Sequence, residues 1–238
     1  MNRRRSGPEV AAGIPAIHGG PCHIGPMSGG HDRVRRSYDT VAEEYRSRLA
    51  DELAGKPLDR ALLAALVEEA GPGVVVADLG CGPGHVTAWL AGHGVRAVGI
   101  DLSPEMVAVA RRAYPAAEFR EGDLLRLPAD DGEFGAAVAL YSVIHLDPGE
   151  LRPACAELRR VLRPGAPLLV AVHLGSEVRH LDEWWGHRVD VDFHFFAAET
   201  VVAALTDAGL AVEARLERVA YPQEAATRRL YVLARHPG

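Results

Sequence analysis

The sequence of 238 residues predicts an α/β fold, a doubly wound and mostly parallel sheet with helices on both faces. The apolar, β-branched run Val74–Val76 is typical of a strand buried on both faces. From that strand onward, apolar strand-like segments alternate with helix-like segments, as a doubly wound sheet requires. The strand also ends in a glycine-rich loop that leads into a helix, a pattern that indicates a ligand site at the carboxyl edge of the sheet.

The alternation predicts the positions of the individual elements. The helix expected near 104–113 is also supported by its first residues, because Ser103 is a favoured N-cap and Pro104 suits a first helical turn. Before the first strand, the stretch from His31 reads as two helices broken near Gly55–Pro57. The last two strands, with a loop between them, are predicted to be an antiparallel pair. We expect strands at 74–79, 96–101, 117–120, 135–141, 167–173, 211–219 and 228–235, and helices near 85–92, 104–113, 150–162 and 197–208.

Composition limits the classes of function. The chain is 48% apolar, enough for one domain with a substantial core, and its net charge of -6 gives no general attraction to nucleic acid or membrane phosphates. It contains no apolar run long enough to span a bilayer, so we expect a cytoplasmic protein. Cys22, Cys81 and Cys155 are scattered, which indicates neither a disulfide framework nor a zinc site. Residues 1–30, rich in Gly and Pro, are expected to be a flexible tail. His18, His23 and the following His31 are expected to be solvated, with metal binding as the alternative.

The glycine loop Gly80–Gly84 carries the strongest functional signal. Its three glycines allow sharp turns and close approach to a ligand. A dinucleotide-binding pattern that starts at Gly80 would need glycine where the chain has His85. Asp78, just before the loop, would repel a pyrophosphate but suits a ligand that carries an ammonium group. The loop therefore favours S-adenosylmethionine over NAD.

Two further acids follow at strand ends. Asp101 is placed to accept both hydroxyls of a ribose, and Asp123 is placed to accept from an adenine amino group. With these residues the chain resembles the class I S-adenosylmethionine-dependent methyltransferases, from about Tyr38 to Arg235. The matching segments are DLGCGPG, GIDLSPEM, GDLLRLP, FGAAVALYSVIHL and VLRPGAPLLV. The resemblance implies a Rossmann-like, seven-stranded sheet with one antiparallel strand, in the order 3-2-1-4-5-7-6.

The resemblance and the motifs together assign cofactor-binding residues. We expect the loop to hold the methionine portion, and the acids with their apolar neighbours to hold the nucleoside. Two tyrosines of the N-terminal helical lid, residues 31–70, either line the pocket or pack on the sheet edge. Cys81 is read as a small loop residue, with a nucleophile as the alternative. The expected cofactor-binding residues are Tyr38, Tyr45, Asp78, Gly80, Cys81, Gly82, Gly84, Asp101, Leu102, Met106, Asp123, Leu124 and Tyr141.

Candidate catalytic residues lie near the expected methyl group. His145 follows the fourth strand and could act as a base, orient a carbonyl, or simply bond the adjoining loop. His173 ends the fifth strand and should face the same region. The segment 174–196, rich in aromatic and charged residues, is interpreted as a substrate lid. The alternatives are a metal site of His173 or His194 with Asp192, and a plain hydrophobic cover.

We therefore expect methyl transfer to a small-molecule acceptor, at oxygen, nitrogen or carbon, in secondary metabolism. The chain lacks the turn that resembling enzymes use for nucleobase amines, and it has ALYSV there instead. We expect no bound metal and no nucleic-acid or membrane partner, and we leave a homodimer open. The alternatives are a domain that binds the cofactor for a rearrangement or regulation, and a dinucleotide-dependent oxidoreductase.

Overall fold

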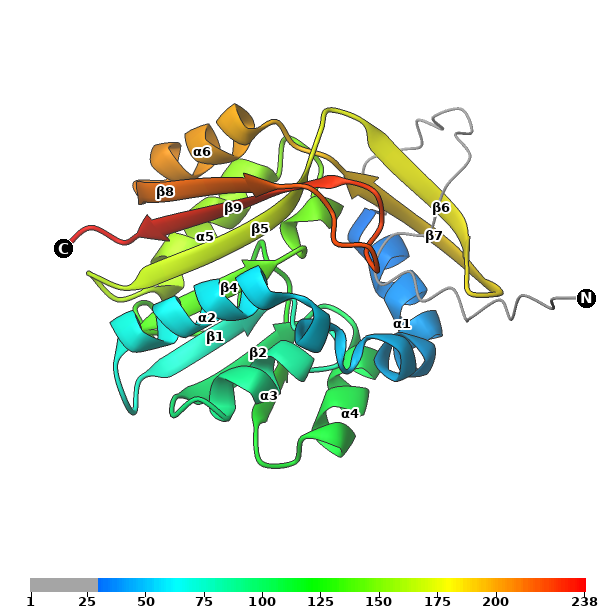
Figure 1. The fold of residues 1–238 in the computed structure, drawn as a ribbon, viewed down its shortest axis with the longest axis horizontal. Coiled ribbons are helices and arrows are strands. Elements are labelled where there is room, and N and C mark those ends of the chain that lie inside the picture. Colours follow the sequence, from blue (N-terminus) through cyan, green and yellow to red (C-terminus); the bar gives the residue numbers. More distant parts are fainter. Residues whose placement is uncertain (1–29) are drawn as a thin grey trace, which may run out of the picture.

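The structure is a computed structural model, and it describes residues 30–238. The expected tail, together with His18, His23 and Cys22, lies outside these residues except for Gly30. A seven-stranded sheet runs through the molecule in the order β3-β2-β1-β4-β5-β9-β8 (Figure 1). Counted without the hairpin β6–β7, this is the expected order 3-2-1-4-5-7-6. The strands of this sheet are β1 (Val75–Leu79), β2 (Arg96–Asp101), β3 (Glu118–Glu121), β4 (Ala136–Leu140), β5 (Pro167–Leu174), β8 (Ala211–Arg218) and β9 (Arg228–Arg235).

The direction of the strands confirms the predicted mixture. Strands β1 to β5 pair in parallel, whereas β9 runs antiparallel to both of its neighbours, β5 and β8. In a parallel sheet the carboxyl ends of the strands meet at one edge. Asp78 of β1, Asp101 of β2 and Leu140 of β4 therefore end up along the same edge.

Helices cover both faces of the sheet. On one face, α2 (Pro57–Ala70) and α3 (His85–Ala91) pack on Val76, Val138 and Leu169. On the other face, α4 (Pro104–Ala113), α5 (Leu151–Val161) and α6 (Ala198–Asp207) bury apolar side chains against the opposite residues of the same strands. The central strands are buried on both sides, which explains why they read as continuous apolar runs.

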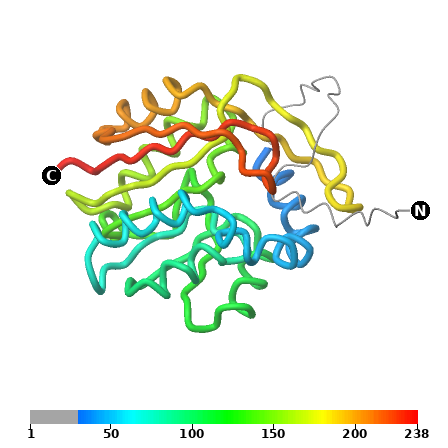
Figure 2. The backbone as a smooth tube through the Cα atoms, viewed as in Figure 1, coloured from blue at the N-terminus to red at the C-terminus, as the bar shows by residue number. Residues whose placement is uncertain are grey.

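The carboxyl edge of the sheet is covered by two elements that are distant in sequence. These are the helix α1 (Gly30–Leu49) and the hairpin of β6 (Val178–Trp184) and β7 (His187–His194). Figures 1 and 2 show them side by side at one end of the molecule. Two short 3-10 helices complete this end, η1 (Glu52–Gly55) and η2 (Val143–His145).

The segment 174–196 forms a β-hairpin, in keeping with its alternating sequence VDVDFHF. It is joined to α1 at several points. The backbone N–H of Asp190 donates to Ser37 Oγ at 2.8 Å, and Arg33 forms ion pairs with Asp190 and Asp192. Helix and hairpin thus form one cover over the sheet edge. None of the helices in residues 30–238 combines the length and apolar character needed to cross a bilayer.

Candidate functional site

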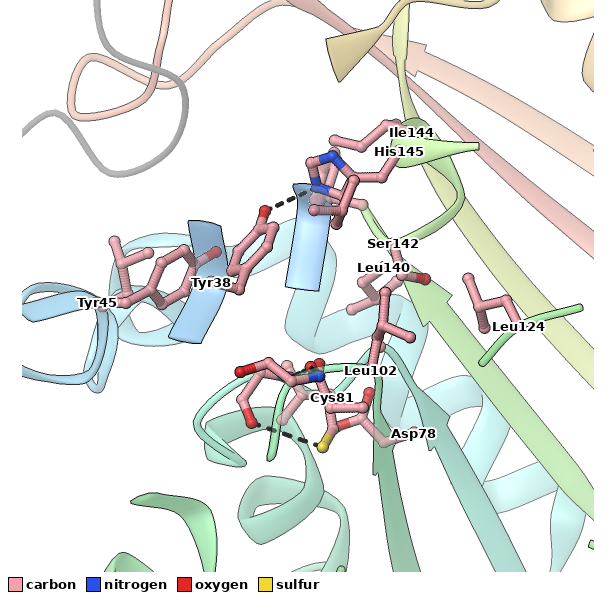
Figure 3. Close-up of a pocket in the computed structure, with 18 of the residues that line it drawn as sticks. Tyr38, Tyr45, Asp78, Cys81, Leu102, Leu124, Leu140, Ser142, Ile144 and His145 are labelled. Atoms are coloured by element: carbon pink, nitrogen blue, oxygen red, sulfur yellow. Dashed lines mark hydrogen bonds between the residues drawn. The ribbon is translucent and has the colours of Figure 1, made fainter. Parts of the chain in front are cut away.

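A pocket lies beneath this cover, at the carboxyl edge of the sheet (Figure 3). Its walls come from the glycine loop, the ends of β2, β4 and β5, the helix α1, η2 and the hairpin. The structure brings most of the predicted site residues together in its lining. These are Tyr38, Tyr45, Asp78, Gly80, Cys81, Gly82, Asp101, Leu102, Asp123, Leu124, Tyr141, His145 and His173.

Gly84 and Met106 were expected to bind the cofactor, but neither residue lines the pocket. Met106 is fully buried in the main core. Gly84 has a φ of +85°, and a Cβ there would come within 2.7 Å of the Phe119 ring. The third glycine therefore serves the packing of the loop against β3.

The glycine loop is shaped by contacts that exclude larger side chains. Gly80 has a φ of +78°, and a Cβ there would lie 2.1 Å from the Cβ of Ser142. The backbone N–H groups of Gly80 and Cys81 both donate to Ile100 O, at 2.7 and 3.1 Å, which holds the loop over the end of β2. Ser142 Oγ is buried at this point without a hydrogen-bond partner in the described chain, so it is free to bond a ligand.

Asp101 connects the loop to α4. Its Oδ2 accepts from Gly82 N at 2.7 Å, and its Oδ1 accepts from Ser103 N at 2.9 Å. Ser103 Oγ in turn accepts from Met106 N, which confirms the predicted N-cap. Burial raises the pKa of Asp101 to about 6. Half-buried Leu102 follows it in the lining, so an acceptor group and an apolar surface lie together where the nucleoside is expected.

Asp78 is more enclosed than the sequence indicated. Its side chain is buried and accepts from Thr87 Oγ1 at 2.6 Å, and burial raises its pKa to about 6. This carboxylate therefore anchors α3 through Thr87, and it also lines the pocket. Cys81 is also buried, and its pKa is raised by burial and by the carboxylates of Asp101 and Asp78. A protonated thiol disfavours the nucleophile alternative.

His31 corrects an expectation, because it is not a solvated tail residue. Its Nδ1 lies 2.6 Å from Asp123 Oδ2 and its Nε2 lies 3.2 Å from Glu150 Oε2. Burial lowers the pKa of His31, but the two carboxylates outweigh burial and raise the pKa above its usual value. His31 thus fastens the start of α1 over the predicted adenine end. Asp123 Oδ1 also accepts from Leu125 N, so an adenine amino group would share this carboxylate with His31.

The opposite part of the pocket is aromatic. Tyr38 and Tyr45 of α1 each meet Trp184 of the hairpin, with ring centroids 5.5 and 5.6 Å apart. Phe193 closes the same wall, and Trp184 and Phe193 are both buried. Both tyrosines line the pocket, the first alternative considered for them, and their rings also pack on Trp184 of the hairpin. We call this part the aromatic compartment: Tyr38, Tyr45, His145, Trp184 and Phe193.

His145 is held in one tautomer within this compartment. Its Nδ1 lies 3.0 Å from the carbonyl oxygen of Asp192, which can only accept, so Nδ1 carries the proton. Its Nε2 then accepts from the hydroxyl of Tyr38 at 2.7 Å (Figure 3). Burial lowers the pKa of His145 to about 4, which keeps the ring neutral near pH 7. The pair Tyr38–His145 connects the lid helix with the end of β4.

His173 and Tyr141 form another part of the lining. Their rings lie 5.0 Å apart, and His173 Nδ1 lies 2.8 Å from Thr227 Oγ1. Burial lowers the pKa of His173 to about 3, helped by the positive charge of Arg229. Tyr141 has a φ of +57°, a strained value for a residue other than glycine.

A buried polar network is hydrogen-bonded to Tyr141 through the hydroxyl of Tyr231. Tyr231 donates to Asp59 Oδ1 at 2.9 Å, so the Tyr141 hydroxyl, 2.9 Å from that of Tyr231, must act as donor in their bond. Arg218 bonds both Asp59 and Glu224. Because each buried charge has a partner, the network holds Tyr141 firmly in place.

Sequence reasoning missed the charged part of the lining. It comprises Arg35, Glu52, Lys56, Asp59, His85, Glu224 and Arg229. An acid and a base four residues apart normally indicate a solvated pair, and no periodic pattern marked Glu224 or Arg229 as buried. The metal alternative has no counterpart in residues 30–238, where no three His, Cys, Asp or Glu side chains are grouped to hold an ion.

Comparisons with known proteins agree with this geometry. Residues 76–165 match a family model described as a methyltransferase domain. The chain is 36% identical over 143 residues to a demethylmenaquinone methyltransferase of Beutenbergia cavernae, covering 59% of this chain and 58% of that protein. It is 36% identical over 152 residues to an O-methyltransferase of Penicillium expansum, covering 61% and 52%. The chain thus spans about half the length of these curated relatives.

Solved structures share the fold. The 1,6-didemethyltoxoflavin-N1-methyltransferase of Burkholderia thailandensis, with S-adenosylhomocysteine bound, has a TM-score of 0.69 at 22% identity and covers 91% of this chain and 94% of its own. The magnesium protoporphyrin IX methyltransferase of Synechocystis, with S-adenosylmethionine bound, has a TM-score of 0.67 at 16% identity, covering 90% and 100%.

The pocket fits the cofactor of such proteins. The close glycine loop, the carboxylate of Asp101 and Ser142, whose Oγ has no hydrogen-bond partner within residues 30–238, lie in one lining at the carboxyl edge of the sheet. The motifs, the strand order and the methyltransferase domain at residues 76–165 converge on one assignment. Residues 76–165 therefore form a methyltransferase domain, and the chain resembles the class I S-adenosylmethionine-dependent methyltransferases in its motifs and fold.

Proposed function

We propose that this protein transfers the methyl group of S-adenosylmethionine to a small-molecule acceptor held in the aromatic compartment. One observation carries the proposal: the same pocket is lined by the glycine loop with Asp101 at one end and by Tyr38, His145 and Trp184 at the other. A cofactor at the loop and an acceptor under the lid would therefore meet in one enclosed space. The structural neighbour that holds 1,6-didemethyltoxoflavin together with S-adenosylhomocysteine supports an acceptor of low molecular weight.

Positioning is the main contribution of the chain. The cofactor supplies an electrophilic methyl group on a sulfonium, and transfer requires an acceptor atom in line behind that methyl group. Holding two reactants in this geometry is worth about 7–11 kcal/mol of the barrier. The hairpin and α1 exclude water, while the aromatic faces of Trp184 and Phe193 favour an apolar or ring-bearing acceptor.

Tyr38 and His145 are the candidates for moving a proton. In the resting geometry Tyr38 donates to the unprotonated Nε2 of His145. An acceptor hydroxyl bonded to the Tyr38 oxygen would pass its proton to Tyr38 as the Tyr38 proton moves to His145. A pKa of about 4 makes His145 a weak base, so this route suits acidic hydroxyls such as phenols or carboxylic acids. His173 and Tyr141 are proposed to orient the acceptor from the other wall.

The proposal is tested by measuring whether the protein turns over S-adenosylmethionine in the presence of an acceptor. Purified protein is incubated with S-adenosylmethionine and a panel of phenols, carboxylic acids, amines and activated carbon acids, and S-adenosylhomocysteine is quantified by mass spectrometry. The proposal predicts acceptor-dependent formation of S-adenosylhomocysteine together with a methylated product. Tight binding of S-adenosylhomocysteine without turnover on any acceptor would instead favour a role without transfer. We also propose that the acceptor belongs to secondary metabolism and that the protein acts in the cytoplasm.

A further inference from the structure

A buried acid–base pair lies at the end of the pocket where the glycine loop meets α3. Glu52 belongs to η1 and Lys56 precedes the first residue of α2, four residues later. Their side chains are only 15% and 8% exposed, yet both line the pocket. The proposed transfer mechanism gives neither of them a role, although burying two charges beside a cavity is costly.

Both side chains keep capacity for a ligand. A lysine ammonium has three donors. Lys56 Nζ lies 2.7 Å from Glu52 Oε2 but 3.7 Å from Glu224 Oε1, which is beyond a hydrogen bond. Each carboxylate oxygen of Glu52 can accept more than one bond, and they take one each, from His85 Nε2 at 2.8 Å and from Lys56. Burial alone would raise the pKa of Glu52, but Lys56 and His85 outweigh it and lower the pKa to about 2.

The position of the pair is fixed by His85. This residue directly follows the last glycine of the loop and begins α3, and it bonds Glu52. His85 lines the pocket, and its Nδ1 is buried with no hydrogen-bond partner in residues 30–238. Asp78, the acid first expected to attract an ammonium group, is buried and accepts from Thr87 through Oδ2. Glu52 is a second carboxylate in the pocket lining, and it is paired directly with a cation, Lys56.

We propose that Glu52 and Lys56 together bind the α-amino-acid end of the cofactor. Lys56 pairs with its carboxylate, Glu52 pairs with its ammonium group, and His85 holds Glu52 in place. An α-amino acid presents one positive and one negative charge, the complement of the pair on the protein. The inference rests on the proposed function, because it assumes that S-adenosylmethionine is the cofactor.

The test compares two nucleosides by isothermal titration calorimetry on the full chain. S-adenosylhomocysteine carries the amino-acid end, whereas 5′-methylthioadenosine has the same adenosine and sulfur with a methyl group instead. Lys56→Met should weaken S-adenosylhomocysteine binding by about tenfold or more, the usual effect of losing a bond to a charged group. It should leave 5′-methylthioadenosine binding within about twofold of wild type, which also shows that the variant is folded. Lys56→Arg should restore part of the affinity.

Arg152→Met provides a matched control, because it removes an exposed cation that pairs with Asp207 and lies outside the pocket lining. It should change neither affinity. If Lys56→Met leaves S-adenosylhomocysteine binding unchanged, or weakens both nucleosides equally, the inference is overturned while the cofactor assignment stands. If the wild type binds S-adenosylhomocysteine no more tightly than 5′-methylthioadenosine, the inference also fails. If the wild type binds neither nucleoside, the proposed function falls and takes the inference with it.

Discussion

The two ends of the pocket are built in different ways. At the cofactor end, Asp78 and Asp101 lie in the last residues of their strands, and the glycine loop is fixed by contacts with the neighbouring strand end, such as that of Gly82 N with Asp101. At the acceptor end, contacts join residues far apart in sequence, such as Tyr38 with His145 and Ser37 with Asp190. The first arrangement follows from the sheet itself, and the second depends on α1 and the hairpin lying together over the sheet edge. Substitutions at the two ends should therefore have separable effects on binding and on turnover.

The largest difference between the effect on turnover and the effect on cofactor affinity is expected at the acceptor end. His145→Ala removes the proposed proton acceptor and should lower turnover by about 10²–10⁴, the range typical of general acid–base groups. S-adenosylhomocysteine affinity should stay near that of the wild type. Steady-state formation of S-adenosylhomocysteine and calorimetry give the two values. Tyr38→Phe, which keeps the ring but loses the hydroxyl, should show a smaller loss of turnover. Equal losses of turnover and of affinity in His145→Ala would show that the residue organises the fold instead.

Gly80→Ala should produce the reverse pattern at the cofactor end. The new Cβ would collide with Ser142 at a φ of +78°. Backbone strain of about 1–3 kcal/mol and overpacking of about 1–3 kcal/mol should lower S-adenosylhomocysteine affinity by about a hundredfold. The matched control is Gly94→Ala, which has a φ of +90° with no atom within 4 Å of the new Cβ and lies outside the pocket lining. Should both variants bind equally well, close approach of the loop would not be needed.

Asp101 connects cofactor binding to pH. Its pKa is raised by burial to about 6, so the carboxylate gains a proton and loses acceptor capacity as the pH falls through that value. The affinity for S-adenosylhomocysteine should therefore decline between about pH 7.5 and pH 5. Asp101→Asn should reduce affinity at pH 7.5 by about tenfold and flatten the pH dependence. Calorimetry at four pH values measures both effects. An Asp101→Asn protein with the wild-type pH profile would assign the titration to another group, Asp78 first.

The smallest effect on activity is expected for the surface ion pairs that join α1 to the hairpin. Arg33 forms partly exposed ion pairs with Asp190 and Asp192, and such pairs are worth about 0–1 kcal/mol. Arg33→Gln should raise the KM for the acceptor by less than about fivefold and leave the cofactor affinity unchanged. Arg36→Gln, an exposed residue of the same helix, is the control. A large loss of cofactor affinity in Arg33→Gln would contradict the separation of the two ends.

Much of the fold could be predicted because local patterns determine it. The strand Val75–Leu79 reads as apolar on both faces, and Ser103 with Pro104 marks the start of α4. The position of β9 between β5 and β8 came from resemblance, since periodicity does not give strand order.

The site was predictable at its cofactor end for the same reason. Because the carboxyl ends of parallel strands meet at one edge, Asp101 and Gly80 lie close together independently of the other elements. By contrast, the bonds of His31 with Asp123 and Glu150 depend on where α1 lies over the sheet. Lys56 is buried only because η1 and the loop that carries Glu224 fold against the pocket, which no local pattern records.

One measurement tests the central claim most directly: parallel calorimetric titrations of the wild-type protein with S-adenosylhomocysteine and with NAD. A sulfonium nucleoside site predicts saturable, one-to-one binding of S-adenosylhomocysteine and no detectable heat with NAD. Binding of NAD with no response to S-adenosylhomocysteine would contradict it.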